Sequence, residues 1–444
     1  MKKNWLYIIP VVALLLLASG CSSSDDDGYS TDFFPRIFDP TNVFSIPSYV
    51  INVGDEVTFE NLAFSPGGVV DISWKINGEE VSKEESYTFT ATEGGEFELV
   101  LEVKNGEDTV TRNTFILVSP ENYEFKPYTA VVMPYLSDQG SSESINWDIV
   151  THIAFKCGRV LPGGDLEVIA GENAQTADAL VARSHLNGIP VLMGISGRLS
   201  GIDGWALYES NDFGNVIRDP QTRDILIENI VSYVSEKKMD GVDIMMTDLN
   251  SGLASSNAAA VGPFITALKS ALPEGSLVTV TVATNWVHSE YTDLSDADWL
   301  NVRAFENGAH VGPGAPPGQS SPLSYMVQGA NLWVNQHNIP ANKIVLGIPA
   351  FGVRYDQLDE NGNNASWGSY AYMRYNDILA EDPDAATQEY SDIAFGVYYN
   401  GIPLVEEKAT YIRDNQFLGA YIWAGDYDAA GANSLTGTLY NILN

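Results

Sequence analysis

Hydrophobic and polar residues follow two different patterns along the chain, and the first covers residues 39–120. There they alternate at a period of two residues, as in "VVDISWKINGEEV" and "GGEFELVLEVKNG". A strand turns successive side chains to opposite faces, so this alternation is typical of strands with one buried face. Asn-Gly pairs at 77–78 and 105–106 predict hairpin turns. With Trp74 as a core residue, the segment predicts a small β-sandwich.

The second pattern covers residues 125–444, where apolar strands alternate with amphipathic helical stretches. Helices are predicted in runs such as 177–188, 221–238 and 261–272. Eight strands with helices between them predict a (β/α)8 barrel, in which the active site lies at the C-terminal ends of the strands. The eight predicted strands are 128–135, 150–157, 189–196, 241–248, 277–284, 299–305, 343–351 and 418–425.

The N-terminus has the pattern of an export signal. Residues 1–20 combine two lysines with the apolar run "WLYIIPVVALLLLA", which is short for a membrane span. The run ends in "LASGC", which resembles a bacterial lipobox and implies lipidation of Cys21; the alternative is a plain secretory signal with a chance cysteine. Residues 21–38 predict a flexible acidic tether. Its acidic run resembles the surface-export signal of Bacteroidetes lipoproteins, which implies a surface-exposed location on the outer membrane.

Charge and cysteine content restrict the partners. The chain has 23 Lys and Arg against 58 Asp and Glu, which gives a net charge of −35. Such a surface repels nucleic acid and anionic lipid, whereas neutral polysaccharides are not repelled. Cys157 is the one cysteine besides Cys21, so we expect no intrachain disulfide and a small buried side chain at Cys157. No sequence cluster has metal-ligand spacing and no phosphate loop is present, so we expect no metal and no cofactor.

Four strand motifs, in the right order, resemble those of glycoside hydrolase family 18, the chitinase and endo-β-N-acetylglucosaminidase family. "MDGVDIMMT" lies at the fourth strand, where the family has DxxDxDxE. "WLNVRAFE", "NKIVLGIPAFG" and "GAYIWAGDYD" correspond to the sixth, seventh and eighth strands. Residues 39–120 resemble PKD-type immunoglobulin-like modules, which are usually spacers and sometimes bind sugars; we expect a spacer.

The resemblance implies a catalytic site that this chain has lost. In the family, the substrate's acetamido oxygen attacks the anomeric carbon, a Glu protonates the leaving oxygen, and an Asp two residues earlier orients the acetamido group. Asp240 and Asp243 match the first two motif positions, but Met245 replaces the orienting Asp and Thr247 replaces the acid. Alternate residues of a strand share a face, so we expect residues 243, 245 and 247 to face the barrel mouth. Neither Met nor Thr can take over this acid–base role.

The sixth strand departs from the family pattern in the same direction. Phe305 replaces a Tyr that supports the reactive intermediate, Arg303 stands where Met is usual, and Glu306 stands where Asp is usual. The combined changes predict catalytic decay or repurposing, with no catalytic residue retained. A relocated acid is the alternative: Glu306 is at the strand's mouth, whereas alternation turns Asp248 away from it.

The aromatic residues for sugar stacking remain. Trp423 ends the eighth strand, where the family has a Trp that floors the central subsite, and indole rings stack on sugar C–H faces without an acid. The alternative for each aromatic residue is barrel packing. The predicted glycan-binding residues are Trp423, Trp286, Tyr135, Glu306, Phe305 and Arg303.

The sequence therefore predicts a surface lipoprotein that captures oligosaccharide or polysaccharide with an inactive chitinase-like barrel. Its expected setting is the utilisation of polysaccharides or glycoprotein glycans, with outer-membrane glycan-uptake proteins as candidate partners. Two alternatives remain open: an active glycosidase with relocated catalytic residues, and a protein-binding or adhesion module. The identity of the sugar does not follow from the sequence, and Met245 weakens the case for N-acetylated ligands.

Overall fold

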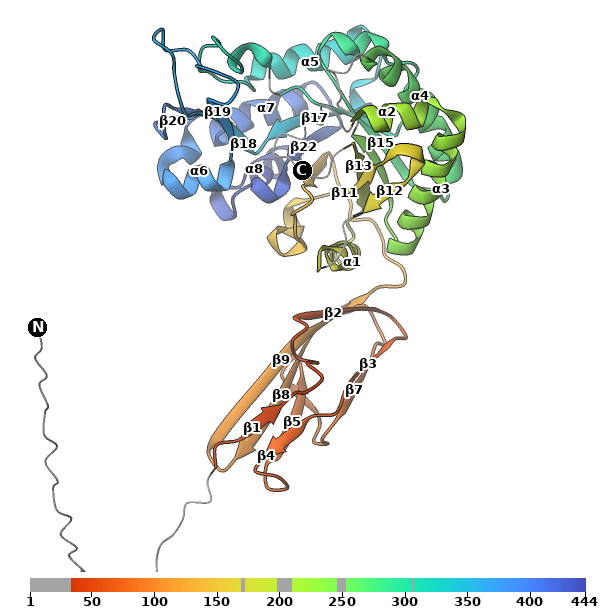
Figure 1. Cartoon of the computed structure of the whole chain (residues 1–444), viewed down its shortest axis with the longest axis vertical. Helices are drawn as coiled ribbons and strands as arrows, with labels where there is room; N and C mark the ends of the chain where they lie inside the picture. Colours follow the sequence, from red (N-terminus) through yellow and green to blue (C-terminus); the bar gives the residue numbers. More distant parts are fainter. Residues whose placement is uncertain (1–32, 169–171, 198–209, 246–252, 306) are drawn as a thin grey trace, which may run out of the picture.

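The chain folds into a β-sandwich and a barrel that lie one above the other (Figure 1). The computed structural model describes residues 33–168, 172–197, 210–245, 253–305 and 307–444. Among these residues, no helix is long and apolar enough to cross a lipid bilayer.

The sandwich consists of a five-stranded sheet, in the order β2-β9-β8-β5-β6, and the pairs β3–β7 and β1–β4. Its core is built around the fully buried Trp74, whose indole Nε1 donates to the carbonyl of Glu84. The alternating hydrophobic pattern therefore reflects strands that bury one face, as predicted. Strand β1 lies within the segment that we predicted as tether, so the β-structure begins earlier than residue 39. The strands are β1 (Arg36–Phe38), β2 (Ser48–Asn52), β3 (Glu56–Phe59), β4 (Ala63–Ser65), β5 (Asp71–Ile76), β6 (Glu79–Ser82), β7 (Tyr87–Thr90), β8 (Gly95–Asn105) and β9 (Asp108–Ser119).

Eight parallel strands form the closed barrel, which confirms the predicted fold class. Strand β10 pairs with both β22 and β11, so the sheet has no open edge at that point. The short β12 (Leu166–Val168) is added to β11 in antiparallel fashion. The barrel strands are β10 (Val131–Leu136), β11 (Ile153–Val160), β13 (Val191–Ser196), β14 (Gly241–Met245), β15 (Leu277–Val282), β16 (Trp299–Val302), β17 (Ile344–Pro349) and β22 (Gly419–Trp423).

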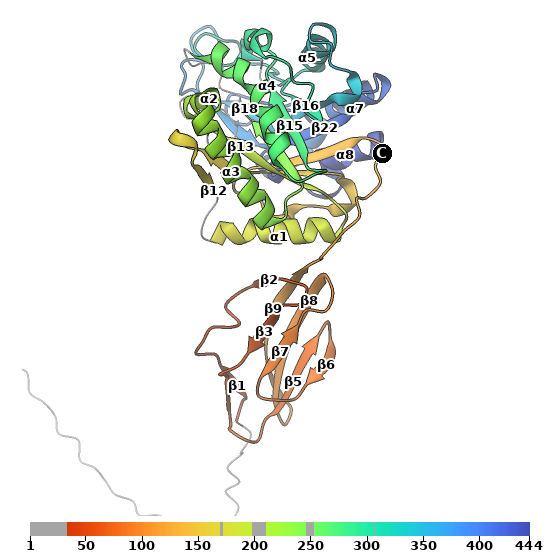
Figure 2. The same cartoon turned by 90° about the vertical axis from the view of Figure 1, so that its right-hand side faces the viewer.

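The helices surround the barrel, as Figure 2 shows. Between β15 and β16 the described chain has only a 3-10 turn, η4 (Trp286–Glu290), in place of a full helix. The α-helices are α1 (Glu172–Leu186), α2 (Ser210–Arg218), α3 (Pro220–Lys237), α4 (Ala254–Ala271), α5 (Leu323–Asn335), α6 (Tyr375–Glu381), α7 (Ile402–Asp414) and α8 (Leu435–Leu443).

An insertion between β17 and β22 was not predicted from the sequence. It contains α6 and a four-stranded antiparallel sheet in the order β19-β18-β21-β20. The paired residues Tyr355 and Tyr370, and likewise Val353 and Tyr372, share one face of this sheet. The strands are β18 (Phe351–Tyr355), β19 (Tyr370–Arg374), β20 (Tyr390–Ser391) and β21 (Val397–Tyr398).

Candidate functional site

Asp243 projects into the barrel and holds neighbouring strands together. It is fully buried on β14. Its carboxylate accepts hydrogen bonds from Thr279 Oγ1 (2.5 Å), Asn301 Nδ2 (2.8 Å) and Thr281 Oγ1 (3.1 Å), which belong to β15 and β16. These bonds satisfy a buried carboxylate with internal donors.

The surroundings of Asp243 change its acidity and that of Tyr135. Burial raises the pKa of Asp243 above 3.8, and the hydroxyl and amide donors act in the opposite direction. Burial, followed by the charge of Asp243, raises the pKa of Tyr135 well above 10. The Tyr135 hydroxyl is therefore a neutral group at physiological pH, inside the barrel rather than on an open cleft wall.

Met245 has the position that the strand pattern predicts. It lies two residues after Asp243 at the C-terminal end of β14, and its side chain is only 2% exposed. A thioether at this point offers neither a carboxylate nor a strong hydrogen-bond acceptor. Thr247 and Asp248 lie outside the described residues, as does Glu306.

Asp240 lies at the opposite end of the barrel from the mouth. It precedes β14, and its carboxylate accepts bonds from Tyr123 Oη (2.5 Å) and the backbone N–H of Val191 (2.7 Å). His185 Nε2 lies 2.9 Å from the same carboxylate. The first motif aspartate therefore fastens neighbouring segments together. Asp240 and Asp243 belong to one sequence motif, but their carboxylates bind different parts of the protein.

Trp423 lies at the end of β22 as predicted, but its indole is fully buried. The Tyr135 ring packs edge-on against it, with centroids 5.1 Å apart. Lys156 Nζ lies 5.6 Å from the centre of the indole ring, an arrangement suited to a cation–π contact. The sequence prediction missed Lys156, although a lysine within the apolar run "VTHIAFKC" of the second strand was a visible signal.

Arg303 and Phe305 meet at the end of the sixth strand. The Arg303 guanidinium carbon lies 4.4 Å from the centre of the Phe305 ring. Phe305 also packs near Phe351 and Tyr421, at centroid distances of 6.2 and 6.3 Å. Both Phe305 and Arg303 are buried, so these predicted binding residues form part of a packed barrel interior.

Trp286 differs from these buried residues in its exposure. It lies on η4, which packs against α4, and its side chain is 59% exposed. The structure thus brings Trp423, Tyr135 and Lys156 together in the barrel interior, whereas Trp286, four residues after the end of β15, has an exposed side chain.

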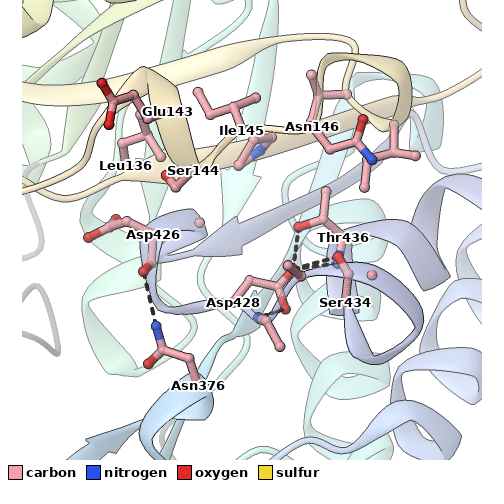
Figure 3. Close-up of a pocket in the computed structure, with 17 residues that line it drawn as sticks. Leu136, Glu143, Ser144, Ile145, Asn146, Asn376, Asp426, Asp428, Ser434 and Thr436 are labelled. Carbon is pink, nitrogen blue, oxygen red and sulfur yellow. Dashed lines mark hydrogen bonds between the residues drawn. The ribbon is translucent and has the colours of Figure 1, made fainter. Parts of the chain in front are cut away.

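A hollow of about 350 Å³, which was not predicted, lies between the end of β10, the segment after β22 and the start of α8 (Figure 3). Its apolar wall includes Pro134 and Leu136, and its polar wall includes Asp426 and Asp428. Asp428 accepts bonds from the backbone and side chains at the start of α8, and Asp426 accepts two bonds from Ser137. These carboxylates are therefore used inside the protein, which favours a structural role for the hollow. Within the described residues, no group of three or more His, Cys, Asp or Glu side chains could hold a metal ion.

The fold and the motif strands define a family of barrel proteins. The profile of glycosyl hydrolases family 18 matches residues 103–428, and that of a PKD-like domain matches residues 44–105. The chain belongs to glycosyl hydrolases family 18.

Solved structures agree on the fold. A chitinase from Bacteroides thetaiotaomicron superposes with a TM-score of 0.58 at 22% identity, covering 71% of this chain and 96% of that one. The chitinase-like agglutinin of Robinia pseudoacacia superposes with a TM-score of 0.57 at 18% identity, covering 71% and 100%.

Curated relatives match a smaller share of the chain. Endochitinase 1 of Metarhizium robertsii is 26% identical over 171 residues, which is 33% of this chain and 39% of that protein. A chitinase-like effector of Moniliophthora roreri is 22% identical over 287 residues, or 58% and 67% of the two chains. The chain therefore spans well under half of the first of these relatives.

Proposed function

We propose that this protein is a cell-surface lipoprotein that binds glycans through a family 18 barrel and does not hydrolyse them. One observation carries the proposal: the fourth strand keeps Asp243 but has Met245 and Thr247 where the family chemistry needs two carboxylates. Asp243 is tied to Thr279, Thr281 and Asn301 by hydrogen bonds, which suits a structural role.

The aromatic residues at the mouth support ligand binding rather than loss of all function. Trp423 is kept at the end of β22, with Tyr135 beside it. Because the indole is covered in this structure, a sugar that stacks on it must first displace a neighbouring side chain, and Lys156 lies over the indole ring. Two similar proteins have names that describe them as chitinase-like rather than as chitinases: the agglutinin shares the fold, and the effector is similar in sequence.

Two other functions remain testable. An active glycosidase would need an acid outside the family position, and Glu306 and Asp248 are the nearest carboxylates in sequence. A protein-binding or adhesion module would not need a tryptophan for sugar stacking at the end of the eighth strand, so the presence of Trp423 there counts against it.

Binding is tested with the glycan that an array identifies, by calorimetry on the unaltered chain and on Trp423→Ala. Loss of a buried stacking indole should cost at least about 2 kcal/mol, roughly thirtyfold in affinity. Trp286→Ala is measured alongside, because the exposed tryptophan that follows β15 is also a predicted glycan-binding residue and should likewise lose affinity if it contacts the glycan. Circular dichroism must show that each variant is folded, and unchanged affinity in folded Trp423→Ala would refute binding at this mouth.

Hydrolysis is tested with chitooligosaccharides and chitobiose-core glycans over long incubations. We expect no products, since loss of a general acid alone lowers rates on the order of 10² to 10⁴-fold. Turnover that disappears in Glu306→Gln or Asp248→Asn would establish the glycosidase alternative and identify its acid.

A further inference from the structure

The segment that joins the two domains is fastened to the barrel along its length. This linker, residues 120–130, connects β9 to β10. The Tyr123 ring stacks on His185, with centroids 3.9 Å apart and planes 13° apart, and its hydroxyl donates to Asp240 (2.5 Å). A flexible linker would leave such groups in water.

The second half of the linker is fastened as well. The backbone N–H of Lys126 donates to the carbonyl of Gly188 (2.7 Å). Gly188 has a φ of +72°, and a Cβ there would lie 2.7 Å from the carbonyl oxygen of Glu124, so a side chain would clash with the linker. The Asn444 side chain accepts bonds from the N–H groups of Thr129 (2.8 Å) and Ala130 (3.1 Å).

The sandwich also contacts the barrel directly. Arg183 on α1 pairs with Glu96 on β8, with an N–O distance of 2.5 Å. Lys238, which follows α3, donates to the side chain of Asn52 at the end of β2 (2.7 Å). Both views show α1 lying across the near end of the sandwich. The Arg183–Glu96 ion pair and the Lys238–Asn52 hydrogen bond together favour one relative orientation of the two domains.

We propose that the linker and these contacts lock the sandwich and the barrel into one rigid stand, with Asp240 as the residue that holds the linker. Asp240 and Gly188 precede β14 and β13, so the sandwich attaches at the N-terminal ends of the barrel strands. The barrel mouth is at the opposite, C-terminal ends. The lock therefore fixes the mouth facing away from the sandwich.

The chain enters the stand at its far end. The carbonyl of Phe33 accepts a bond from Asn105, which lies at the turn between β8 and β9. Strand β9 then runs 12 residues to the linker, about 40 Å at roughly 3.4 Å per residue. If the sandwich and the barrel are locked together, the barrel is held about 40 Å from Phe33, where the described chain begins, and at a fixed angle to the sandwich.

The test is a distance distribution between spin labels on Asp108→Cys and Glu407→Cys, measured on the chain from residue 22 onward. These exposed positions lie on the far turn of the sandwich and on α7. The lock predicts a single narrow distribution. A free linker of 11 residues would allow end-to-end variation of about 18 Å, so a broad distribution in this chain overturns the proposal.

Matched variants assign the lock to its residues. Tyr123→Ala combined with Arg183→Ala should broaden the distribution, whereas Arg112→Ala, on the exposed surface of the sandwich, should not. A narrow distribution in the folded double variant would overturn the assignment to Tyr123 and Arg183. If that variant fails to fold, Tyr123→Phe in about 1 M salt replaces it: the ring stays on His185, the bond to Asp240 is lost, and the Arg183–Glu96 pair is screened. Broadening is again expected, and a narrow distribution again overturns the assignment.

Discussion

Two aspartates of one motif have different structural environments. Asp243 lies in the barrel interior, between donors from β15 and β16. Asp240, three residues earlier, lies at the opposite end of the barrel and binds Tyr123 of the linker. The sequence placed Asp243 on the fourth strand correctly, whereas Asp240 lies just before that strand. It could not reveal the partners of either residue, because those come from distant segments. The two aspartates that the motif retains therefore support the structure. The two carboxylates that catalysis in the family needs are replaced by Met245 and Thr247.

Replacing Asp243 should separate its hydrogen-bonding role from its charge. Asp243→Ala leaves three buried donors without an acceptor, and each costs about 1–3 kcal/mol, so we expect a loss of at least about 3 kcal/mol in unfolding free energy. Asp243→Asn keeps an acceptor and should cost less. Denaturant titration of both variants measures the difference, and equal costs would contradict this role.

The pH dependence gives a second test of Asp243. Burial raises its folded pKa above the unfolded value near 3.8, so the folded state holds the proton more tightly. The resulting stabilisation is fully present below the unfolded pKa and is lost as pH rises through the folded pKa. Relative to Asp243→Asn, the unaltered protein should therefore lose unfolding free energy as pH rises from about 4 toward neutrality. A difference that does not change with pH would count against the raised pKa.

At the scale of elements, the segment between β16 and α5 is held by the helix that precedes β22. Lys408 on α7 is fully buried, and its ammonium donates to the Ser321 carbonyl (2.7 Å), the Ser321 hydroxyl (2.9 Å) and the Asn400 side chain. Gln319 in the same segment donates to the carbonyl of Tyr399 (2.6 Å). The segment is thereby joined to the insertion, although the two are separated in sequence.

Lys408 should make stability depend on pH in the alkaline range. Burial lowers its pKa from 10.5 to about 7, so between these values the unfolded chain binds more protons than the folded one. Stability should rise as pH increases from about 7 to 10, by a few kcal/mol at most, since one pKa unit corresponds to about 1.4 kcal/mol. Lys408→Met should reduce this slope, while Lys83→Met, a control at an exposed lysine, should not. A slope that persists in Lys408→Met would refute this assignment.

The elements also show which parts of the fold a hydrophobic pattern can predict. All eight barrel strands were predictable, because each is an apolar run buried on both faces. The insertion was not, since β20 and β21 are only two residues long and give no periodic signal. The absence of a full helix between β15 and β16 was not predicted either, and Trp286 lies instead on a 3-10 turn, η4. Trp423 was placed correctly at its strand end, but its burial depends on side chains from other strands, such as Lys156 and Tyr135.

At the scale of the whole molecule, the order of the parts suits presentation of the barrel to the exterior. The described chain enters the sandwich at one end, and the barrel is attached at the other, with its mouth on the far side. A net charge of −35 keeps such a surface away from anionic lipid. If the chain is anchored to a membrane before residue 33, this arrangement holds the barrel mouth away from that membrane. The sequence predicts a lipidated cysteine and an acidic tether in that segment.

Lipidation at Cys21 is the prediction on which that arrangement depends. Labelling of expressing cells with a clickable fatty acid should mark the unaltered protein and fail to mark Cys21→Ser. Cys157→Ser is the matched control: its thiol is fully buried, and burial raises its pKa to about 12, so it should neither carry lipid nor affect labelling. Since one acyl chain anchors weakly and two anchor stably, Cys21→Ser should also move the protein from the membrane fraction to the soluble fraction. A label that persists in Cys21→Ser, or a mature N-terminus at another residue, would remove the anchor and with it the reason for a stand that faces the mouth outward.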